Sequence, residues 1–441
     1  MNQADTQAAK NHATATASAM SPASPPPLKQ WRDRNGCDHQ ERPLPEHHHT
    51  RVAPDRIIGP IERAWEDVSV RESLRQQILD SAQPEIQADP DDPTRSLWTW
   101  TVCAPRARAV LLWTNPFFDP QDLSRNELAH LPESDLWTMT ARMPHDLRAS
   151  YRIAIWEEET EPPWRSASKP RLAALAAIRC ARPDPRAEHW VIGSHGQISS
   201  VAAGPRAPRQ QWNTSAQSQI RSTQQIRLDS GDTVWIYTPP EITQPTPLLV
   251  LFDGDVWKRS LPAIMDDLMA TGVLPPLHVA MLDARAQDYR WNHLGVPAGQ
   301  VDVVLDHLLP VVRDGWKVSS ESNDTIVAGQ SLGGISALWT LALGGDQVGH
   351  AIAQSPSLWR FDVTQALLDS PQWRSIELHA GTCEGQMLHD VEALVASVDG
   401  DPRGAHRSVH VSRFCAGHDW AAWHVNLVNS LQCLLARLQR D

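Results

Sequence analysis

The chain has 441 residues and a formal net charge of −12 at pH 7, with 41% hydrophobic and 21% charged residues. This length is enough for two domains. The acidic charge argues against a general nucleic-acid-binding protein, which would present a basic surface. No stretch is as long as a membrane span, and the N-terminus lacks the apolar region of a signal peptide. We therefore expect a globular cytoplasmic protein whose partners are neither nucleic acids nor membranes.

The residue types that most often bind metals do not form a recognisable motif. The six cysteines include no C-x-x-C pair, which argues against the common zinc and redox motifs and favours free thiols. Residues 1–58 are rich in Ala, Pro, Ser, Thr and His and poor in large apolar groups, so we expect a disordered tail. The three consecutive histidines at positions 47–49 have no second ligand cluster beside them. The sequence therefore predicts no metal site and no cofactor.

Residues 59–160 have the pattern of an antiparallel β-domain. A helix is expected first, over residues 60–80, where apolar residues recur at helical spacing. The runs SLWTWTVCAP, AVLLWTN, DLWTMTARMP and ASYRIAIWEE then alternate with a period of two and are separated by Pro, Asn and Asp. Several short strands without intervening helices indicate a β-sandwich. Residues 161–226, rich in Pro, Arg, Ala and Ser, are expected to form an extended linker that wraps one domain onto the other.

Residues 227–441 have the pattern of an α/β domain. Short apolar runs such as TVWIYTPP, PLLVLFDGD, LHVAMLD and DTIVAG alternate with helical stretches such as QVDVVLDHLLPVVRDGW. This alternation predicts a mostly parallel sheet with helices on both faces. Ligands of such sheets bind beyond the carboxyl ends of the strands. We therefore expect the loops that follow these runs to form one functional surface.

The segment VAGQSLGGISALW, residues 327–339, has the pattern of a nucleophile elbow. DTIVA predicts a strand, GQSLG a tight turn and GISALWTLAL a helix, which is the context that a G-x-S-x-G motif requires. Ser331 must adopt a strained backbone conformation in such a turn, and Gly329 and Gly333 let the strand and the helix approach closely. We therefore predict that Ser331 is a catalytic nucleophile.

A serine nucleophile needs a general base, and the base needs an acid that orients it. In hydrolases with this elbow, the acid and then the histidine follow the serine along the chain. His418, in FCAGHDW, follows the expected strand SVHVSRF, and Glu384, in GTCEGQ, follows the expected strand SIELHAG. We therefore predict that His418 is the base and Glu384 the acid, with Asp390 as the reserve candidate for the acid.

Ester hydrolysis by this route also needs hydrogen-bond donors for the developing oxyanion. The backbone N–H of Leu332, the residue after the nucleophile, is expected to supply one donor. The second is expected from the turn in VLFDGDVW, where we select the N–H of Gly254 or Asp255. A simple Asp-Gly turn is an equally good interpretation of that segment.

The loops expected on this surface also contain cationic and aromatic side chains. A local positive lining on an acidic protein favours an anionic substrate. Aromatic groups beside cations suit an electron-rich aromatic anion. The residues expected to bind the substrate are Arg290, Trp257, Lys258, Arg259, Arg285, Trp359 and Arg360, and Trp291 lies in the same loops.

The carboxyl-terminal half resembles the enterochelin (enterobactin) esterase family of esterase-D-like α/β-hydrolases. The resemblance runs, in order, through VLFDGDVW, RWNHL, VAGQSLGG, QSPSLW, HAGTCEG and GHDWAAW. DLWTMTARMPHDLRASYRI, and the connector from PDPRAEHW to GPRAPRQQW, are similar to that family's immunoglobulin-like N-terminal domain and linker. The resemblance therefore covers about residues 60–440 and implies an α/β-hydrolase preceded by an immunoglobulin-like sandwich.

Membership of this family implies a specific reaction. It implies that the chain hydrolyses the tri-serine lactone of a ferric catecholate siderophore in the cytoplasm and so releases iron. The family's nucleophile, acid and base map onto Ser331, Glu384 and His418, and its oxyanion glycine maps onto Gly254. The iron belongs to the small-molecule substrate, so no metal site of the protein is implied.

Two positions depart from the family's pattern, and two other functions stay open. His293 stands where a Glu is common, and His424 follows Trp423 where an Arg is common. Both departures concern substrate contacts and leave open which siderophore is used. The alternatives are a general carboxylesterase for acylated sugars or feruloyl-type esters, and a non-catalytic ferric-siderophore-binding protein. The sequence is compatible with a monomer or a dimer.

Overall fold

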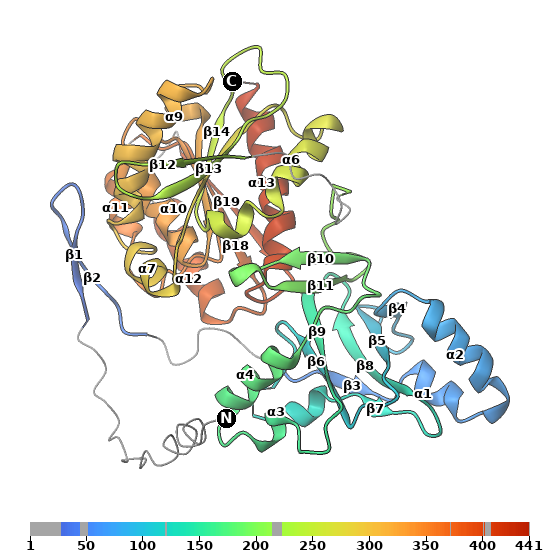
Figure 1. Cartoon of the computed structure of the whole chain (residues 1–441). Coiled ribbons are helices and arrows are strands. Elements are labelled where there is room, and N and C mark those ends of the chain that lie inside the picture. The colour runs from blue at the N-terminus through green and yellow to red at the C-terminus, as the bar shows by residue number, and fades with distance from the viewer. Residues whose placement is uncertain are drawn as a thin grey trace, which may run out of the picture.

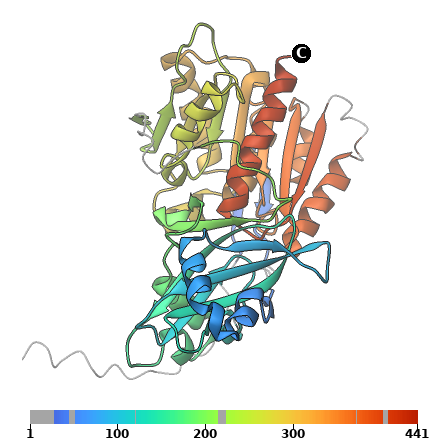
Figure 2. The ribbon, with the colours of Figure 1, turned by 90° about the vertical axis from the view of Figure 1, so that its right-hand side faces the viewer.

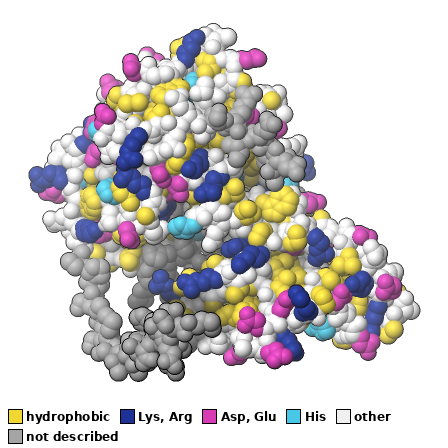
Figure 3. Space-filling view, in the orientation of Figure 1, with side chains coloured by type: hydrophobic (Ala, Val, Ile, Leu, Met, Phe, Trp, Pro, Cys, Tyr) yellow, Lys and Arg dark blue, Asp and Glu magenta, His cyan; other side chains and the backbone are white. Residues whose placement is uncertain are grey.

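The computed structural model of the chain describes residues 28–44, 52–119, 121–213, 223–370, 372–399, 401 and 407–440. The histidine run at positions 47–49 lies outside these residues. Figures 1 and 2 show two parts: a smaller one built mainly from β-strands, and a larger one in which helices cover both faces of a sheet. On the face shown in Figure 3, basic and acidic side chains are interspersed.

Two antiparallel sheets pack together in the amino-terminal part. The first sheet contains, in order, β3 (Asp55–Ile57), β8 (Leu136–Pro144), β5 (Arg95–Cys103) and β4 (Glu85–Ala88), and β7 (Ala129–His130) pairs with β8. The second contains, in order, β10 (His189–Ile192), β11 (Ile198–Ala203), β9 (Arg148–Trp156) and β6 (Ala109–Thr114). Side chains from both sheets share one core, which includes Trp98, Trp100, Val110, Met139 and Tyr151. The expected β-domain is therefore present.

The helix expected over residues 60–80 is divided into α1 (Pro60–Trp65) and α2 (Arg71–Asp80). Between them the Asp67 side chain accepts a hydrogen bond from the N–H of Ser69 and caps a short 3₁₀ turn (Val68–Val70). An aspartate side chain that bonds to a nearby backbone N–H offers an alternative to the hydrogen bonds of a continuous helix, so one helix ends and another begins here. Ile61 and Trp65 nevertheless reach one buried cluster with Ile78 of α2, as the helical spacing of these residues predicts.

Residues 163–203, expected to lie in an extended linker, instead belong to the amino-terminal part. They form α3 (Pro163–Ser166) and α4 (Pro170–Cys180) and then the strands β10 and β11. Ala173 and Ala177 of α4 are buried against Leu111 and Ala154 of the second sheet. Small side chains at this contact let the helix lie close to the strands. The high content of Ala and Arg in this segment does not by itself indicate such a contact.

Residues 28–44, expected in the disordered tail, form an ordered hairpin instead. Its strands are β1 (Gln30–Arg32) and β2 (Asp38–Gln40). The His39 ring meets the buried Trp339 ring of the larger part at a centroid distance of 4.8 Å. Arg34 forms an ion pair with Asp306 at 2.6 Å. Ring and ion-pair contacts to distant residues thus order a segment whose own composition is poor in apolar groups.

The carboxyl-terminal part contains a mixed eight-stranded sheet. Its strands are, from one edge to the other, β12 (Gln224–Arg227), β13 (Thr233–Tyr237), β15 (His278–Leu282), β14 (Leu248–Leu251), β16 (Thr325–Gln330), β17 (His350–Gln354), β18 (Ser375–Gly381) and β19 (Ser408–Phe414). β12 and β13 are antiparallel to their neighbours, and the other six strands are parallel. The central strands are buried along their whole length, as expected for a sheet covered on both faces.

Helices on the two faces of this sheet pack into two separate cores. α9 (Leu309–Gly315), α10 (Leu332–Leu343) and α12 (Gln386–Asp399) contribute to the core on one face. α6 (Leu261–Ala270) and α13 (Trp420–Leu438) contribute to the core on the other. Other helical segments of this part are α5 (Gly254–Trp257), α7 (Gln287–His293), α8 (Gln300–Asp302), a π-helical segment (Val303–Leu308) and α11 (Thr364–Asp369). Among the described residues, no helix combines the length and the apolar character that crossing a membrane requires.

The first prediction concerns the core that supports α10. Leu338 of α10 is fully buried, so Leu338→Ala removes buried methyl groups and leaves a cavity. We expect the free energy of unfolding to fall by about 2–5 kcal/mol, measured by urea denaturation. Leu175→Ala is the control, because Leu175 is 41% exposed and an exposed change of this kind shifts stability by about 0.5 kcal/mol or less. Equal effects of the two substitutions would contradict this assignment of the core.

Candidate functional site

Ser331 lies in a strained turn between β16 and α10. Its φ of 57° and ψ of −118° lie in a region that non-glycine residues seldom adopt. The backbone of Gly333 leaves no room for a side chain at position 329, because a Cβ on Gly329 would lie 2.4 Å from the carbonyl of Gly333. A hydrogen bond of 2.9 Å from the N–H of Ser331 to the carbonyl of Gln354 holds the turn against β17. The turn thus has the geometry that the sequence pattern predicts.

Glu384 and His418 form a hydrogen-bonded pair. Nδ1 of His418 lies 2.7 Å from Oε1 of the fully buried Glu384. Oε2 of the same carboxylate accepts hydrogen bonds from the Ser355 hydroxyl at 2.8 Å and from the N–H of Gly381 at 2.6 Å. The Trp423 ring packs edge-on against the imidazole at a centroid distance of 4.6 Å. Because the carboxylate is fixed on one side, it fixes the orientation of the imidazole on the other.

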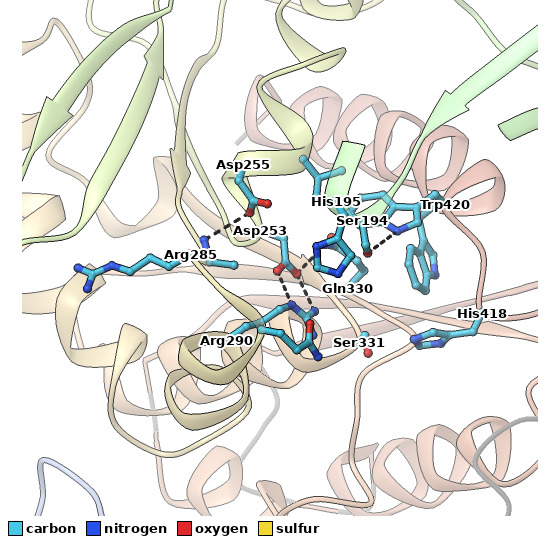
Figure 4. Close-up of a pocket in the computed structure, with 14 residues that line it drawn as sticks. Ser194, His195, Asp253, Asp255, Arg285, Arg290, Gln330, Ser331, His418 and Trp420 are labelled. Atoms are coloured by element: carbon cyan, nitrogen blue, oxygen red, sulfur yellow. Dashed lines mark hydrogen bonds and ion pairs between the residues drawn. The ribbon is translucent and has the colours of Figure 1, made fainter. Parts of the chain in front are cut away.

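Ser331 and His418 line the same pocket, which has a volume of about 330 Å³. Figure 4 shows the ring of His418 directed toward Ser331. The Ser331 hydroxyl also lies 3.3 Å from the hydroxyl of Ser357. The pocket therefore brings together a hydroxyl on a strained turn, an imidazole and, behind it, a buried carboxylate. This set of groups is the one that ester hydrolysis through a serine nucleophile requires.

The two turns expected to supply oxyanion donors lie next to each other. Leu332 is the first residue of α10 and Gly254 the first of α5, so their N–H groups have no acceptor within these helices. The preceding strands β16 and β14 are paired in the sheet. The Gln330 side chain donates a hydrogen bond of 2.9 Å to Asp253 across the two turns. Asp255, the third predicted residue, lines the pocket, and burial raises the pKa of its carboxyl group.

Two of the predicted substrate-binding cations line the pocket, and both are paired with carboxylates. Arg290 forms a bidentate ion pair with the buried Asp253 at 2.6 and 2.9 Å. Arg285 forms an ion pair with Asp232 at 2.8 Å, and Figure 4 shows its side chain directed away from Ser331. The pocket is therefore close to electrically balanced instead of strongly positive.

Three predicted substrate contacts lie elsewhere. Trp257 is completely buried and donates a hydrogen bond of 3.1 Å to Gln330. The Lys258 ammonium group lies over the ring of Trp235 at 3.4 Å from its centroid. Arg259 lines a second cavity, between the two parts of the chain. The sequence pattern places these residues in the correct loop, but their side chains do not line the pocket that contains Ser331.

Arg360 and Trp359 lie under the hairpin of residues 28–44. Arg360 is almost fully buried and forms an ion pair of 3.2 Å with Glu41 of the hairpin segment. Its guanidinium group lies 4.4 Å from the ring centroid of Trp291, and Trp291 stacks with Trp359. These residues form a cationic and aromatic cluster as the sequence suggests, but the cluster does not line the Ser331 pocket and its arginine is paired with Glu41.

The pocket also contains residues that sequence analysis did not select. Ser194 and His195 come from the amino-terminal part, and Trp420 and Trp423 come from the start of α13. Trp420 donates a hydrogen bond of 3.3 Å to the Ser194 hydroxyl. His195 has a positive φ of 58° and lies between Ser194 and Gly196, and the sequence GSHGQ was the available indication of an exposed turn. Its position in this pocket depends on how the two parts pack.

The two histidines that depart from the family's pattern have different surroundings. His293 stacks on Tyr289 with ring centroids 3.9 Å apart, and burial lowers its pKa. His424 is buried, and this burial lowers its pKa to about 4. His424 lines the second cavity, not the pocket that contains Ser331. Its ring is therefore uncharged at neutral pH.

Two protein-family models match the chain one after the other. The model described as "Enterochelin esterase, N-terminal" matches residues 97–213, and the model described as "Putative esterase" matches residues 226–434. Together with the sheet and its helices, these matches define an ester hydrolase of the α/β-hydrolase type with an amino-terminal β-domain.

Named relatives are similar to most of the chain. The iron(III) salmochelin esterase of Escherichia coli O6:H1 is 27% identical, over 78% of this chain and 88% of that protein. The iron(III) enterobactin esterase of Dickeya dadantii is 28% identical, over 72% of this chain and 80% of that protein. The crystal structure of ferric enterobactin esterase from Salmonella typhimurium has the same fold, with a TM-score of 0.70, 23% identity, and coverage of 83% of this chain and 100% of that one. The chain belongs to the enterochelin esterase family.

The second prediction tests the support of the Glu384 carboxylate. Ser355→Ala removes a donor to Glu384 and also the acceptor of a 2.9 Å hydrogen bond from the Trp423 indole. We expect a loss of about 1.5–3 kcal/mol in unfolding free energy, as for a hydrogen bond to a charged group. Ser397→Ala is the control, because this hydroxyl bonds only to a carbonyl of its own exposed helix turn. Equal stability of the two variants would contradict the arrangement.

Proposed function

We propose that this esterase hydrolyses the serine ester bonds of a ferric catecholate siderophore of the enterobactin type. The observation that carries the proposal is the hydrogen-bonded Glu384–His418 pair facing Ser331 in one pocket. This pair lies in a chain that matches two esterase family models and is similar to named siderophore esterases over 72–78% of its length. The crystal structure of one relative, from Shigella flexneri, was determined in the presence of enterobactin.

The proposed reaction has two halves. The Ser331 hydroxyl attacks the ester carbonyl while His418 takes its proton. The N–H groups of Leu332 and Gly254 then stabilise the oxyanion. When the tetrahedral intermediate collapses, the C–O bond to the departing serine residue of the substrate breaks, and His418 protonates that oxygen. Water, deprotonated by His418, then attacks the acyl-enzyme. The bond between the acyl carbon and the Ser331 oxygen breaks, His418 returns the proton to that oxygen, and a carboxylic acid is released. Glu384 stabilises the imidazolium in both halves.

The pocket offers aromatic and hydrogen-bonding surfaces to such a substrate. Trp420 and His195 lie in the lining with Arg290, and flat aromatic rings suit the dihydroxybenzoyl groups of a catecholate. Since Arg290 is held by Asp253, we propose that it orients the substrate by hydrogen bonds. The iron enters as part of the substrate, and the proposed steps use no cofactor of the protein.

The surroundings of the reaction are also proposed. We infer a cytoplasmic location and a small-molecule partner, as expected for a protein that takes iron from an imported siderophore. We also propose that the amino-terminal domain is an immunoglobulin-like sandwich. Two antiparallel sheets that share one core of alternating side chains support this assignment.

One experiment separates the proposed substrate from the alternatives. Products are followed by chromatography after incubation with ferric enterobactin, with the iron-free trilactone, with a feruloyl ester and with a simple aryl acetate. We expect dihydroxybenzoyl-serine products from the trilactone. Turnover of the aryl acetate and the feruloyl ester alone would favour a general carboxylesterase. Tight binding of the ferric compound without any product would favour a non-catalytic binding protein.

The third prediction concerns the nucleophile. Ser331→Ala is expected to lower kcat for the trilactone by at least about 10³-fold, because a catalytic serine contributes an effect of this size or larger. Binding of the ferric substrate, followed by quenching of tryptophan fluorescence, is expected to change little because the methyl group is smaller than the hydroxymethyl group. Turnover near that of the unchanged enzyme would refute the assignment of Ser331.

The fourth prediction concerns the contribution of the amino-terminal part to substrate binding. His195→Ala is expected to raise KM for the trilactone by roughly 2–10-fold, the effect of losing one hydrogen bond, with little change in kcat. His130→Ala is the control, because the exposed His130 bonds to the Ser134 carbonyl and does not line the pocket. A fall in kcat without a change in KM would contradict a binding role for His195.

A further inference from the structure

The loop that carries His418 is held by the amino-terminal domain. Residues 415–419 lead from β19 into α13, and Figure 1 shows β9, β10 and β11 near the start of α13. The Asn115 side-chain amide donates a hydrogen bond of 2.8 Å to the backbone carbonyl of His418 itself. The backbone N–H of Arg148 donates a hydrogen bond of 3.0 Å to the carbonyl of Cys415. The domain therefore contacts the loop at His418 and three residues before it.

The residues just after His418 are held in the same way. The N–H of Ser150 in β9 donates a hydrogen bond of 2.6 Å to one carboxylate oxygen of Asp419. The other oxygen of Asp419 accepts a bond of 2.9 Å from the N–H of Ala421 and caps α13. The Arg148 side chain donates a bond of 2.8 Å to the Ala421 carbonyl. Since Asp419 and Arg148 are both buried, water competes little for these bonds.

Packing at this contact leaves the loop little freedom. A Cβ on Gly417 would lie 2.7 Å from the Asn115 amide oxygen and 2.8 Å from Pro116. Cys415 is buried within the core of the β-domain, together with side chains of both its sheets. The His418 ring, by contrast, contacts Glu384 and Trp423 of the other part. The ring and the backbone of one residue are thus fixed by different domains.

We propose that Asn115 is a positioning residue for the reaction. Through Asn115 and β9, the amino-terminal domain holds His418 at its working position beside Ser331. This inference rests on the proposed roles of Ser331 and His418. Proton transfer needs the imidazole within hydrogen-bonding reach of the hydroxyl, and a displacement of about 1 Å can lower a rate about 10²-fold. Glu384 orients the ring but does not bind the backbone from which the ring projects. Asn115 supplies that constraint from outside the hydrolase domain.

Two variants of the full-length chain test the proposal. Asn115→Ala removes the donor to the His418 carbonyl. Asp419→Asn keeps a residue type that caps helices well but weakens the charge-assisted bond from Ser150. For both we expect kcat for the trilactone to fall at least about tenfold, with KM within about twofold. We also expect labelling of Ser331 by a small fluorophosphonate to slow by a similar factor, since the reagent uses Ser331 and His418 and none of the contacts of a large substrate.

Gln211→Ala is the matched control. The Gln211 side chain also joins the amino-terminal region to α13, through a hydrogen bond of 2.8 Å to Asn429, but at a position remote from His418 along the helix. We expect its kcat and its labelling rate to equal those of the unchanged enzyme. The melting temperature of each variant is measured in parallel.

The outcomes distinguish a failure of this inference from a failure of the proposed function. Folded Asn115→Ala and Asp419→Asn variants with unchanged kcat and labelling would overturn the inference, and so would a higher KM at unchanged kcat. Equal losses in Gln211→Ala would also overturn it, because they would show a general effect of the interface on stability. If Ser331→Ala is inactive while the Asn115 variant is fully active, only this inference fails. If Ser331→Ala keeps its turnover, the proposed function fails as well.

Discussion

The backbone contact between Gly329 and Gly333 is the constraint on which the site depends. Because β16 and α10 approach so closely that a Cβ at position 329 would overlap the carbonyl of Gly333, position 329 can hold only glycine. Ser331 is forced into a positive φ, at a cost of about 1–3 kcal/mol. The strand is paired on both sides, and the helix is buried along its length. This extensive packing offsets the strain and holds the hydroxyl at the sheet edge.

The other groups of the site follow from the topology of the sheet. β16, β17, β18 and β19 are consecutive parallel neighbours, so the loops after them open on the same edge. Glu384 follows β18 and His418 follows β19, which brings residues far apart in the sequence into one hydrogen bond. The amino-terminal domain completes the site, because it contributes His195 to the pocket and binds the loop of His418. The two domains therefore form one site between them.

Sequence analysis predicted best what depends on local pattern and least what depends on distant partners. The pattern of apolar residues predicted the antiparallel β-domain and the mostly parallel sheet of the α/β domain, and the G-x-S-x-G motif predicted the turn at Ser331. The substrate contacts were harder, because the state of an arginine is set by its partner. Arg290 is neutralised by Asp253 and Arg360 by Glu41, and the second pair lies 319 residues apart. No periodicity within a segment indicates such a pairing. The same reason accounts for His195 and for the ordered hairpin, whose positions are fixed by tertiary contacts.

The central claim is that His418 activates the Ser331 hydroxyl. The most direct measurement is the rate at which a fluorophosphonate modifies the enzyme, with the modified residue located by peptide mass spectrometry. The account predicts one adduct, on the peptide that contains Ser331, and a rate that falls by orders of magnitude in His418→Ala although Ser331 is unchanged. An adduct on another serine, or an equal rate in the two proteins, would contradict the account.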